Sequence, residues 1–347
     1  MVILVDQDIG VTISQVTIRH GNMIEGGGGI RSVGYLTLDH VHLIANNAFS
    51  VSSIQVCGGG VHSAVGFLTI RDSLVSGNTV TANGGRPGYG GGVCAYSGML
   101  MERTTVSGNQ ITGIAYELSG GGVFAGGALQ IADSAIIDNQ AERGGGVFTY
   151  NDIQITNTTI SENHALVEGG GIWVGAAEAR TLSLTHTTVY SNTAQTGGGI
   201  SIDNDYTAEL NNAIVAGNIA EVGPDIYNLG AANCLGTLLV GDVSGLTFGG
   251  GCTLMSGLDP LLLPLGYYGG PTPGHLPQQD SPVLDISGCA ELAADQRGLP
   301  RPVDLPAVPN EGEACDLGAM ERQFRIYIPL VYRMSSPVQG SYSTSFK

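Results

Sequence analysis

Hydrophobic and polar residues alternate along short stretches throughout the first two thirds of the chain. Clear examples of this alternation are Leu68/Ile70, Leu129/Ile131, Ile153/Ile155 and Leu182/Leu184. A period of two over so few residues predicts half-buried β-strands rather than helices. Residues 1–228 show no convincing amphipathic helix.

The strands belong to a repeat. A Gly-Gly-Gly-(Val/Ile) phrase ends at Ile30, Val61, Val93, Val123, Val147, Ile172 and Ile200. Between these phrases, an apolar residue, two small or polar residues and an asparagine recur, ending at Asn46, Asn78, Asn109, Asn139, Asn163, Asn192 and Asn218. Units of 24–32 residues with about three short strands each are typical of a parallel β-helix.

We therefore predict an all-β fold, a right-handed parallel β-helix like that of pectate lyases. About eight coils spaced by about 4.8 Å give a rod about 40 Å long. Globin, Rossmann and TIM-barrel folds are excluded because crossover helices are absent.

Stacked coils turn each repeated position into a column of touching residues. The β-branched column from Ile30 to Ile200 is expected to point inward. The asparagines are expected at turns, where their amides bond along the stack and left-handed backbone is tolerated. The glycines are expected to form sharp corners. A phosphate-binding loop would need a following helix, and the repeated Asp of calcium-binding nonapeptides is missing.

Two outward columns carry aromatic residues: the column beside Val123 contains Phe124, Phe148 and Trp173, and the next outward column contains Tyr96 and Tyr150. We expect these to cluster on one face of adjacent coils: Tyr96, Phe124, Phe148, Tyr150 and Trp173. Such rings either stack on sugars or stack on one another beneath the long loops at 79–89 and 112–119. Both interpretations stay open at the level of sequence.

The composition of the chain excludes several classes of function and partner. Thirty acidic against thirteen basic residues give a net charge of −17, which disfavours nucleic acid as a partner. No apolar run reaches the roughly 20 residues of a membrane span. The 55 glycines among 347 residues follow no collagen period. We expect a monomer.

The repeat stops near Gly223, and a region richer in proline, leucine and cysteine follows. It contains Asp259-Pro260-Leu261, Gly269-Gly270-Pro271-Thr272-Pro273, Asp280-Ser281-Pro282-Val283-Leu284-Asp285, Asp295-Gln296-Arg297-Gly298 and Cys315-Asp316-Leu317-Gly318-Ala319. This series resembles the bacterial choice-of-anchor Q domain, which follows right-handed β-helix repeats. The final Ile326–Val331 segment resembles the tail of such proteins in Chloroflexi-type bacteria, and the GGG(I/V) repeats are also similar to those of polymorphic outer-membrane proteins.

The resemblance implies an exported or cell-surface protein and supplies no catalytic residues. The expected divisions are a β-helix at 1–228, the anchor-like region at 229–322, and a strand and flexible tail at 323–347. No signal peptide precedes Val2–Val5, so we expect that the chain starts downstream of the natural N-terminus.

Six cysteines in an exported chain suggest disulfides. We predict Cys234–Cys252 and Cys289–Cys315. Cys57 and Cys94 are offset by about five residues in the repeat, which exceeds the reach of a disulfide along a straight strand, so we expect that they do not pair with each other unless the long loop bends back.

A glycosidase needs two carboxylates facing one groove. Asp203 and Asp205 are the best local pair, provided that the strand continues through them. Motifs of polygalacturonases are absent, and the histidines at 62, 164 and 186 are expected at the surface. Cysteine and histidine spacings indicate no metal site and no cofactor, although calcium stays open.

The favoured hypothesis is a non-catalytic β-solenoid for adhesion, spacing or contact with a glycan or cell-envelope surface. The alternative is a polysaccharide lyase or glycoside hydrolase that uses the aromatic face and nearby acids.

Overall fold

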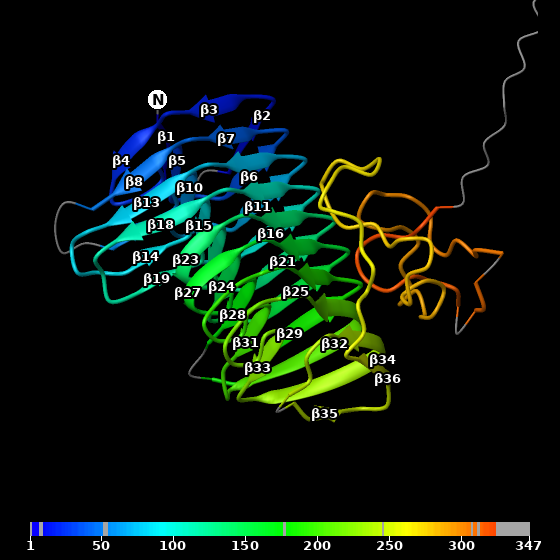
Figure 1. The fold of residues 1–347 in the computed structure, drawn as a ribbon. Helices are drawn as coiled ribbons and strands as arrows, with labels where there is room; N and C mark the ends of the chain where they lie inside the picture. Colours follow the sequence, from blue (N-terminus) through cyan, green and yellow to red (C-terminus); the bar gives the residue numbers. More distant parts are fainter. Residues whose placement is uncertain are drawn as a thin grey trace, which may run out of the picture.

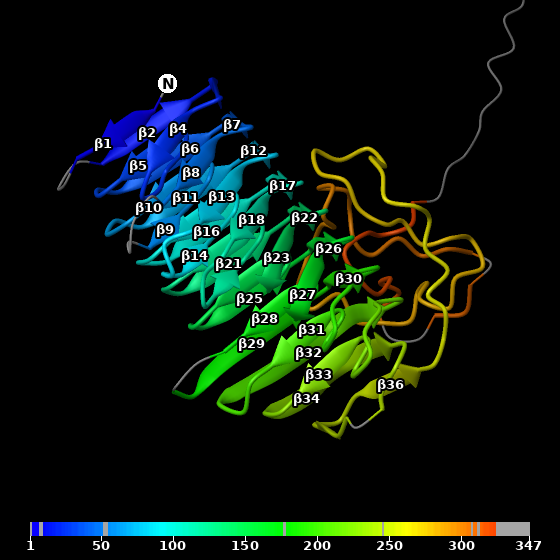
Figure 2. The same ribbon diagram turned by 60° about the vertical axis from the view of Figure 1, so that its left-hand side comes forward.

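A computed structural model describes residues 2–6, 10–50, 55–175, 178–244, 246–306, 308–310 and 313–323. These residues form a stack of about eight β coils, and an irregular segment that follows β36 packs beside the stack (Figures 1 and 2). All pairings between the described strands are parallel, and equivalent positions stay in register from coil to coil except at irregularities in the β23–β27 and β32–β34 pairs. The predicted parallel β-helix is confirmed. The final segment expected at 323–347 lies, apart from Gln323, outside the described residues.

Sheet 1 consists of the strands that follow the glycine turns. Its nine strands are β1 (Ile3–Val5), β5 (Ile30–Ser32), β10 (Val61–Ser63), β15 (Val93–Ala95), β20 (Val123–Ala125), β24 (Val147–Thr149), β28 (Ile172–Val174), β31 (Ile200–Ile202) and β33 (Ile226–Asn228).

Sheet 2 contains two strands from most coils. It consists of β2 (Val11–Ser14), β3 (Thr17–Arg19), β6 (Leu36–Asp39), β7 (His42–Ile44), β11 (Leu68–Arg71), β12 (Leu74–Ser76), β16 (Met99–Glu102), β17 (Thr105–Ser107), β21 (Leu129–Ala132), β22 (Ala135–Ile137), β25 (Ile153–Thr156), β26 (Thr159–Ser161), β29 (Arg180–Thr185), β30 (Thr188–Tyr190), β32 (Tyr206–Ala216), β34 (Ala231–Val240), β35 (Phe248–Gly249) and β36 (Thr253–Ser256).

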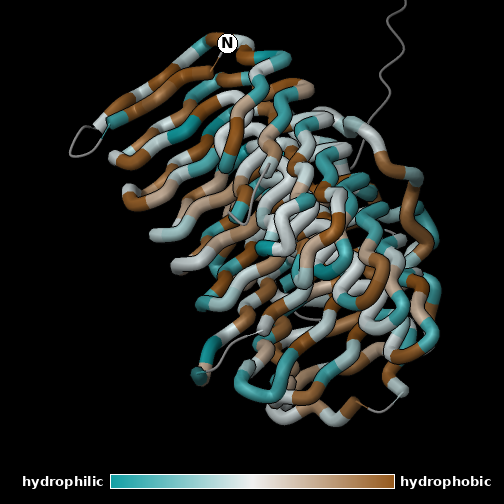
Figure 3. The backbone as a smooth tube through the Cα atoms, turned by 90° about the vertical axis from the view of Figure 1, so that its left-hand side faces the viewer, coloured by the Kyte–Doolittle hydropathy of each residue, from teal (hydrophilic) through white to brown (hydrophobic). Residues whose placement is uncertain are grey.

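Sheet 3 precedes the next glycine turn in the coils up to β27, and isolated bridges at Thr193, Thr196, Ile219 and Val222 continue it in the later coils. It contains β4 (Asn22–Ile24), β8 (Asn47–Phe49), β9 (Val56–Cys57), β13 (Thr79–Ala82), β14 (Gly88–Tyr89), β18 (Gln110–Gly113), β19 (Leu118–Ser119), β23 (Gln140–Arg143) and β27 (His164–Glu168). Apolar and polar positions alternate along these coils (Figure 3). Stacking continues to β36, so the boundary expected after residue 228 falls within the stack.

The inward columns build one continuous core from Val5 to Val240. The seven residues from Ile30 to Ile200 that end the glycine phrases pair with one another and are 0% exposed. Burial of apolar surface at every level is the main source of stability in such a stack, because each coil contacts only its neighbours.

The asparagines form a continuous hydrogen-bonded ladder. The amide group of Asn139 donates to Asn163 Oδ1 at 3.0 Å and to the carbonyl of Val106 at 3.0 Å. Its own Oδ1 accepts from the backbone and side-chain nitrogens of Asn109. The same pattern recurs from Asn46 to Asn218. The left-handed residue expected at the asparagine lies one position earlier, for example Asp138 at φ 54°.

A different structural constraint requires glycine at each position of a triple, as Gly144–Gly146 illustrate. Gly144 has a φ of 57°, which disfavours other residues. A Cβ on Gly145 would lie 2.5 Å from the carbonyl oxygens of Gly170 and His164. One on Gly146 would lie 3.0 Å from Cγ of the ladder residue Asn163. The triple therefore combines a turn with two close approaches.

The segment after residue 256 packs along the outer face of sheet 2 (Figure 1). Its motifs make these contacts: Gln296 Oε1 accepts from Thr159 Oγ1 at 2.6 Å, and the amide of Ala319 donates to Thr188 Oγ1 at 3.0 Å. A small second core, which includes Ile214 and Val283, lies between the two parts.

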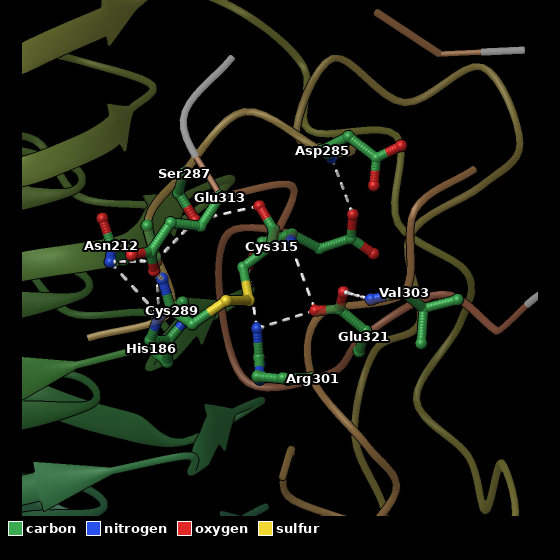
Figure 4. The surroundings of a disulfide bond; sticks show 12 residues. His186, Asn212, Asp285, Ser287, Cys289, Arg301, Val303, Glu313, Cys315 and Glu321 are labelled. Atoms are coloured by element: carbon green, nitrogen blue, oxygen red, sulfur yellow. Dashed lines mark hydrogen bonds and ion pairs between the residues drawn. A yellow bond between two sulfur atoms is a disulfide. The ribbon is translucent and has the colours of Figure 1, made fainter. Parts of the chain in front are cut away.

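Buried charges organise this segment internally, and Figure 4 shows one of the ion pairs, that of Arg301 with Glu321. Arg301 contacts Glu321 at 3.0 Å, and Arg297 contacts Asp295 at 2.6 Å, with all four residues buried. The Asp-Gln-Arg-Gly motif is thus part of a structural network. Burial raises the pKa of the Glu321 carboxyl, although Arg301 opposes this effect.

The structure contains three disulfides, Cys57–Cys94, Cys234–Cys252 and Cys289–Cys315. The last two pairs are those predicted. The first was expected to be unpaired, and this expectation is wrong because the chain is not straight between the cysteines. The turn at Gly58–Gly60 brings Cys57 opposite the next coil, with 5.7 Å between the Cα atoms of Cys57 and Cys94.

Candidate functional site

Side chains before and after each glycine turn meet across the corner of the β-helix. The residue before the turn contacts the residue after the turn in the next coil. This relation gives four contacting pairs, which, together with Phe148 between the second and the third, we call the corner seam: Cys57–Cys94, Tyr89–Phe124, Arg143–Trp173 and Glu168–Ser201. The sequence-predicted aromatic residues all lie in or beside this seam.

Phe124 and Phe148 form the buried centre of the seam. They are 1% and 0% exposed, and Tyr89 stacks on Phe124 with 4.4 Å between ring centroids. The two phenylalanines lie outside the main core, as the alternation predicts, but other aromatic rings cover them, so for these two residues the structure shows stacking on one another rather than exposed faces. Sequence analysis did not single out Tyr89, because its contact with Phe124 depends on the corner geometry.

Tyr150 lies at the rim of the seam, with 37% of its surface exposed. Its hydroxyl donates to Glu117 Oε1 at 2.7 Å, while the Tyr89 hydroxyl donates to Glu117 Oε2 at 2.6 Å. Burial and the contact with Glu117 raise the pKa of Tyr89. Tyr96 is half-buried on the other side of Phe124, and burial raises its pKa to about 12. The phenol groups of Tyr89 and Tyr96 are thus uncharged hydrogen-bonding groups at neutral pH.

Trp173 is half-buried at the end of the aromatic series. One face stacks on Phe148, with 4.3 Å between centroids and 11° between planes. The guanidinium of Arg143 lies 5.5 Å from the indole centroid, within range of a cation–π contact. Arg143 also donates to Glu168 Oε1 at 3.0 Å, and Glu168 Oε2 accepts from Ser201 Oγ at 3.3 Å.

The candidate catalytic acids Asp203 and Asp205 lie in a turn. β31 ends at Ile202 and β32 begins at Tyr206, so the strand does not continue through them as the pairing required. Asp203 is half-buried near the indole: a Cβ on Gly175 would be 2.9 Å from Asp203 Oδ2 and 3.4 Å from Trp173 Cζ2. Burial, with smaller effects of Glu168 and Asp205, raises the pKa of Asp203.

A separate cavity of about 320 Å³ lies where sheet 2 meets the C-terminal segment. It is lined by His40, His42, Asp72, Ser73, Leu74, Arg103, Thr105, Tyr267 and Pro271. Asp39, His40 and Asp72 lie close enough to share a cation, but both oxygens of Asp72 already accept from Arg103. That hydrogen bond lowers the pKa of Asp72, which favours the ion pair over a metal ligand.

Two histidines expected at the surface are buried. His62 is 7% exposed and lies beside the Cys57–Cys94 disulfide, and burial lowers its pKa to about 4. His186 is fully buried between β29, β30 and the C-terminal segment, where its Nε2 lies 3.1 Å from the carbonyl oxygen of Gly288 (Figure 4). The C-terminal segment that covers His186 has no counterpart in the repeat, so alignment of coils could not reveal its burial.

The fold and the seam define a parallel β-helix protein with a buried aromatic corner. No family model, no curated protein and no solved structure matches the chain. Within the described residues there is no helix long and apolar enough to pass through a membrane.

Proposed function

We propose that the protein is an exported, cell-surface module that contacts glycans without turning them over. The observation that supports this proposal is the partly exposed rim of the corner seam, where Tyr150 is 37% exposed and Trp173, between Phe148 and Arg143, is half-buried beside carboxylates. Sugar rings pack their C–H faces on aromatic rings, while carboxylates accept from sugar hydroxyls. Glu117, Glu168 and Asp203 supply such acceptors.

The rigidity of the rim also supports binding. Tyr150 is fixed by Glu117, and Trp173 is fixed between Phe148 and Arg143. Side chains that are already ordered lose little conformational entropy when a ligand binds. The net charge of −17 favours neutral or cationic glycans over polyanionic ones.

Three disulfides are consistent with an oxidising, extracellular location. The Asp-Gln-Arg-Gly and Cys-Asp-Leu-Gly-Ala phrases suggest a choice-of-anchor Q domain, and the buried contacts of Asp295, Arg297 and Asp316 explain why such phrases would specify a fold. In this proposal the C-terminal segment attaches the β-helix to the cell envelope.

The proposal is tested by screening immobilised neutral, basic and acidic glycans with wild-type protein, then measuring affinity by calorimetry. Trp173→Ala and Tyr150→Ala should each weaken binding about tenfold, equivalent to ~1.4 kcal/mol. Tyr35→Ala removes a more exposed tyrosine, 66% against 37% for Tyr150, outside the seam and should leave affinity unchanged. Binding that is insensitive to both rim variants would refute the proposed site.

A second candidate is a glycoside hydrolase or polysaccharide lyase. It is favoured by the raised pKa of Asp203, which is the property of a general acid, beside Glu168 and Trp173. Release of reducing ends or unsaturated products, abolished by Asp203→Asn, would establish this activity. Glycan binding without product release supports the non-catalytic module instead.

A further inference from the structure

The N-terminal end of the corner seam brings two cysteines and one histidine together. Cys57 ends β9, immediately before a glycine turn, and His62 is the central residue of β10 after that turn. Cys94, in the next coil, is the register partner of His62. The ligand atoms of the three residues all lie within 4.8 Å of one another.

We propose that Cys57, Cys94 and His62 form a binding site for a zinc-class metal ion when the Cys57–Cys94 disulfide is reduced. Zinc binds thiolate sulfur at about 2.3 Å and imidazole nitrogen at about 2.0–2.1 Å in tetrahedral geometry. Ligand atoms around such an ion are separated by roughly 3.5–4 Å, so after reduction the two sulfurs must move apart from bonding distance, while a nitrogen of His62 already lies within 4.8 Å of both.

The state of His62 is an independent reason to assign a ligand. The side chain is 7% exposed, yet neither ring nitrogen has a hydrogen-bond partner among the described residues. A buried polar group without a partner costs about 1–3 kcal/mol and is rare in folded proteins. Coordination would use this nitrogen lone pair, which the oxidised protein leaves unused.

The surroundings suit a three-ligand site. The hydroxyl of Tyr96 lies 3.7 Å from Cys57 Sγ, where it can bond to a thiolate or to water in the fourth position. Arg31, the register partner of His62 in the preceding coil, adds a positive charge. Two thiolates balance the charge of a divalent ion, so coordination adds no net positive charge beside Arg31.

Reduction and metal binding are coupled steps with a defined balance. A dithiol reductant transfers two electrons and two protons to the Cys57–Cys94 bond, becomes a disulfide itself and leaves two thiols. The metal ion then displaces both thiol protons as it binds. The disulfide form has no thiolate to offer, so oxidation excludes the metal and the metal opposes oxidation.

Cobalt(II) is a suitable probe, because tetrahedral thiolate coordination gives intense visible absorption. Wild-type protein reduced with a phosphine under anaerobic conditions should bind one equivalent, and oxidised protein should bind none. The double variant Cys57→Ser/Cys94→Ser should lose this absorption. His62→Ala should weaken binding by at least about tenfold, whereas His42→Ala, outside the seam, should not.

Thiol protection gives a test in the wild-type chain that does not depend on variants. Zinc added to reduced protein should slow alkylation of Cys57 and Cys94, but not that of Cys234, Cys252, Cys289 and Cys315, as mapped by mass spectrometry. Equal alkylation of all six cysteines with and without zinc, in protein whose circular dichroism shows intact β structure, would overturn the proposal. So would cobalt absorption that persists without Cys57 and Cys94.

Discussion

Asn218 donates its side-chain amide to Oδ1 of Asp225 over 2.8 Å, and this contact ends the asparagine ladder on a carboxylate. Asp225 Oδ1 also accepts from the backbone nitrogen of Asn218, and its Oδ2 accepts from that of Asp242. All partners of this aspartate are donors. An aspartate therefore suits the end of the ladder, whereas the interior positions must both accept and donate.

This difference predicts that exchange between asparagine and aspartate is costly at Asn139 and mild at Asp225. Asn139→Asp removes two donated hydrogen bonds and places a carboxylate against the oxygens of Asn163 and Val106, so the unfolding free energy should fall by about 3 kcal/mol or more. Asp225→Asn loses only one favourable contact and should cost about 1 kcal/mol. Denaturant unfolding followed by circular dichroism measures both, and equal effects would contradict the polarity assigned to the ladder.

The middle glycine of a triple should not tolerate a side chain. Gly145→Ala places a Cβ 2.5 Å from two carbonyl oxygens of the next coil, and we expect a loss of about 3 kcal/mol or failure to fold. Gly10→Ala is the matched control, since no atom lies within 4 Å of the added carbon. Thermal melting of the two variants gives the comparison; a Gly145→Ala protein as stable as the control would refute close stacking at this turn.

Arg301 should be essential for docking of the C-terminal segment. Arg301→Met leaves Glu321 buried without its cationic partner, which should cost about 3–5 kcal/mol locally. We expect proteolytic cleavage after residue 256 while the coils stay resistant. The double variant Arg301→Met/Glu321→Leu should regain part of this resistance. Unchanged proteolysis of the single variant would show that the pair does not hold the segment.

His186 predicts a pH dependence of stability. Burial, aided by Arg301, lowers its pKa to about 3, whereas the pKa in the unfolded chain stays near 6.5. As pH falls below 6.5 the unfolded chain gains a proton that the folded chain does not, so stability falls by about 1.4 kcal/mol per pH unit. This loss continues down to about pH 3.

The contribution of His186 is isolated by comparison with His186→Gln. Between pH 7 and 5 the wild type should lose about 2 kcal/mol more than this variant, as measured by denaturant unfolding. His62 and His275 also have lowered pKa values, but they are present in both proteins. Parallel pH profiles would contradict the buried, neutral state of His186.

Sequence alone predicted those features that repeat at a fixed position in every coil. The inward valines and isoleucines, the asparagine ladder and the parallel strands all follow from vertical alignment. Contacts that run diagonally across the glycine turn did not follow. The Cys57–Cys94 disulfide and the stacking of Tyr89 on Phe124 depend on the angle of that corner.

Contacts across the glycine turn also determine the candidate site, and they could not be predicted there either. Phe124 and Trp173 occupy equivalent positions, yet one is buried under Tyr89 and the other lies at the rim beside Arg143. Their exposure differs because a different residue precedes the glycine turn of the preceding coil, Tyr89 in one case and Arg143 in the other. An alternation pattern treats this position as an ordinary strand end. Binding surfaces on this β-helix are thus determined by pairs of columns rather than by one.

Each ladder asparagine presents its acceptor toward the preceding coil and its donor toward the following one, so the seven amide dipoles point head to tail. A duplicate of residues 140–163 inserted after Asn163 would meet matching partners on both sides. The protein is therefore extensible in steps of one coil, and the carboxylate of Asp225 would terminate a longer rod as it terminates this one.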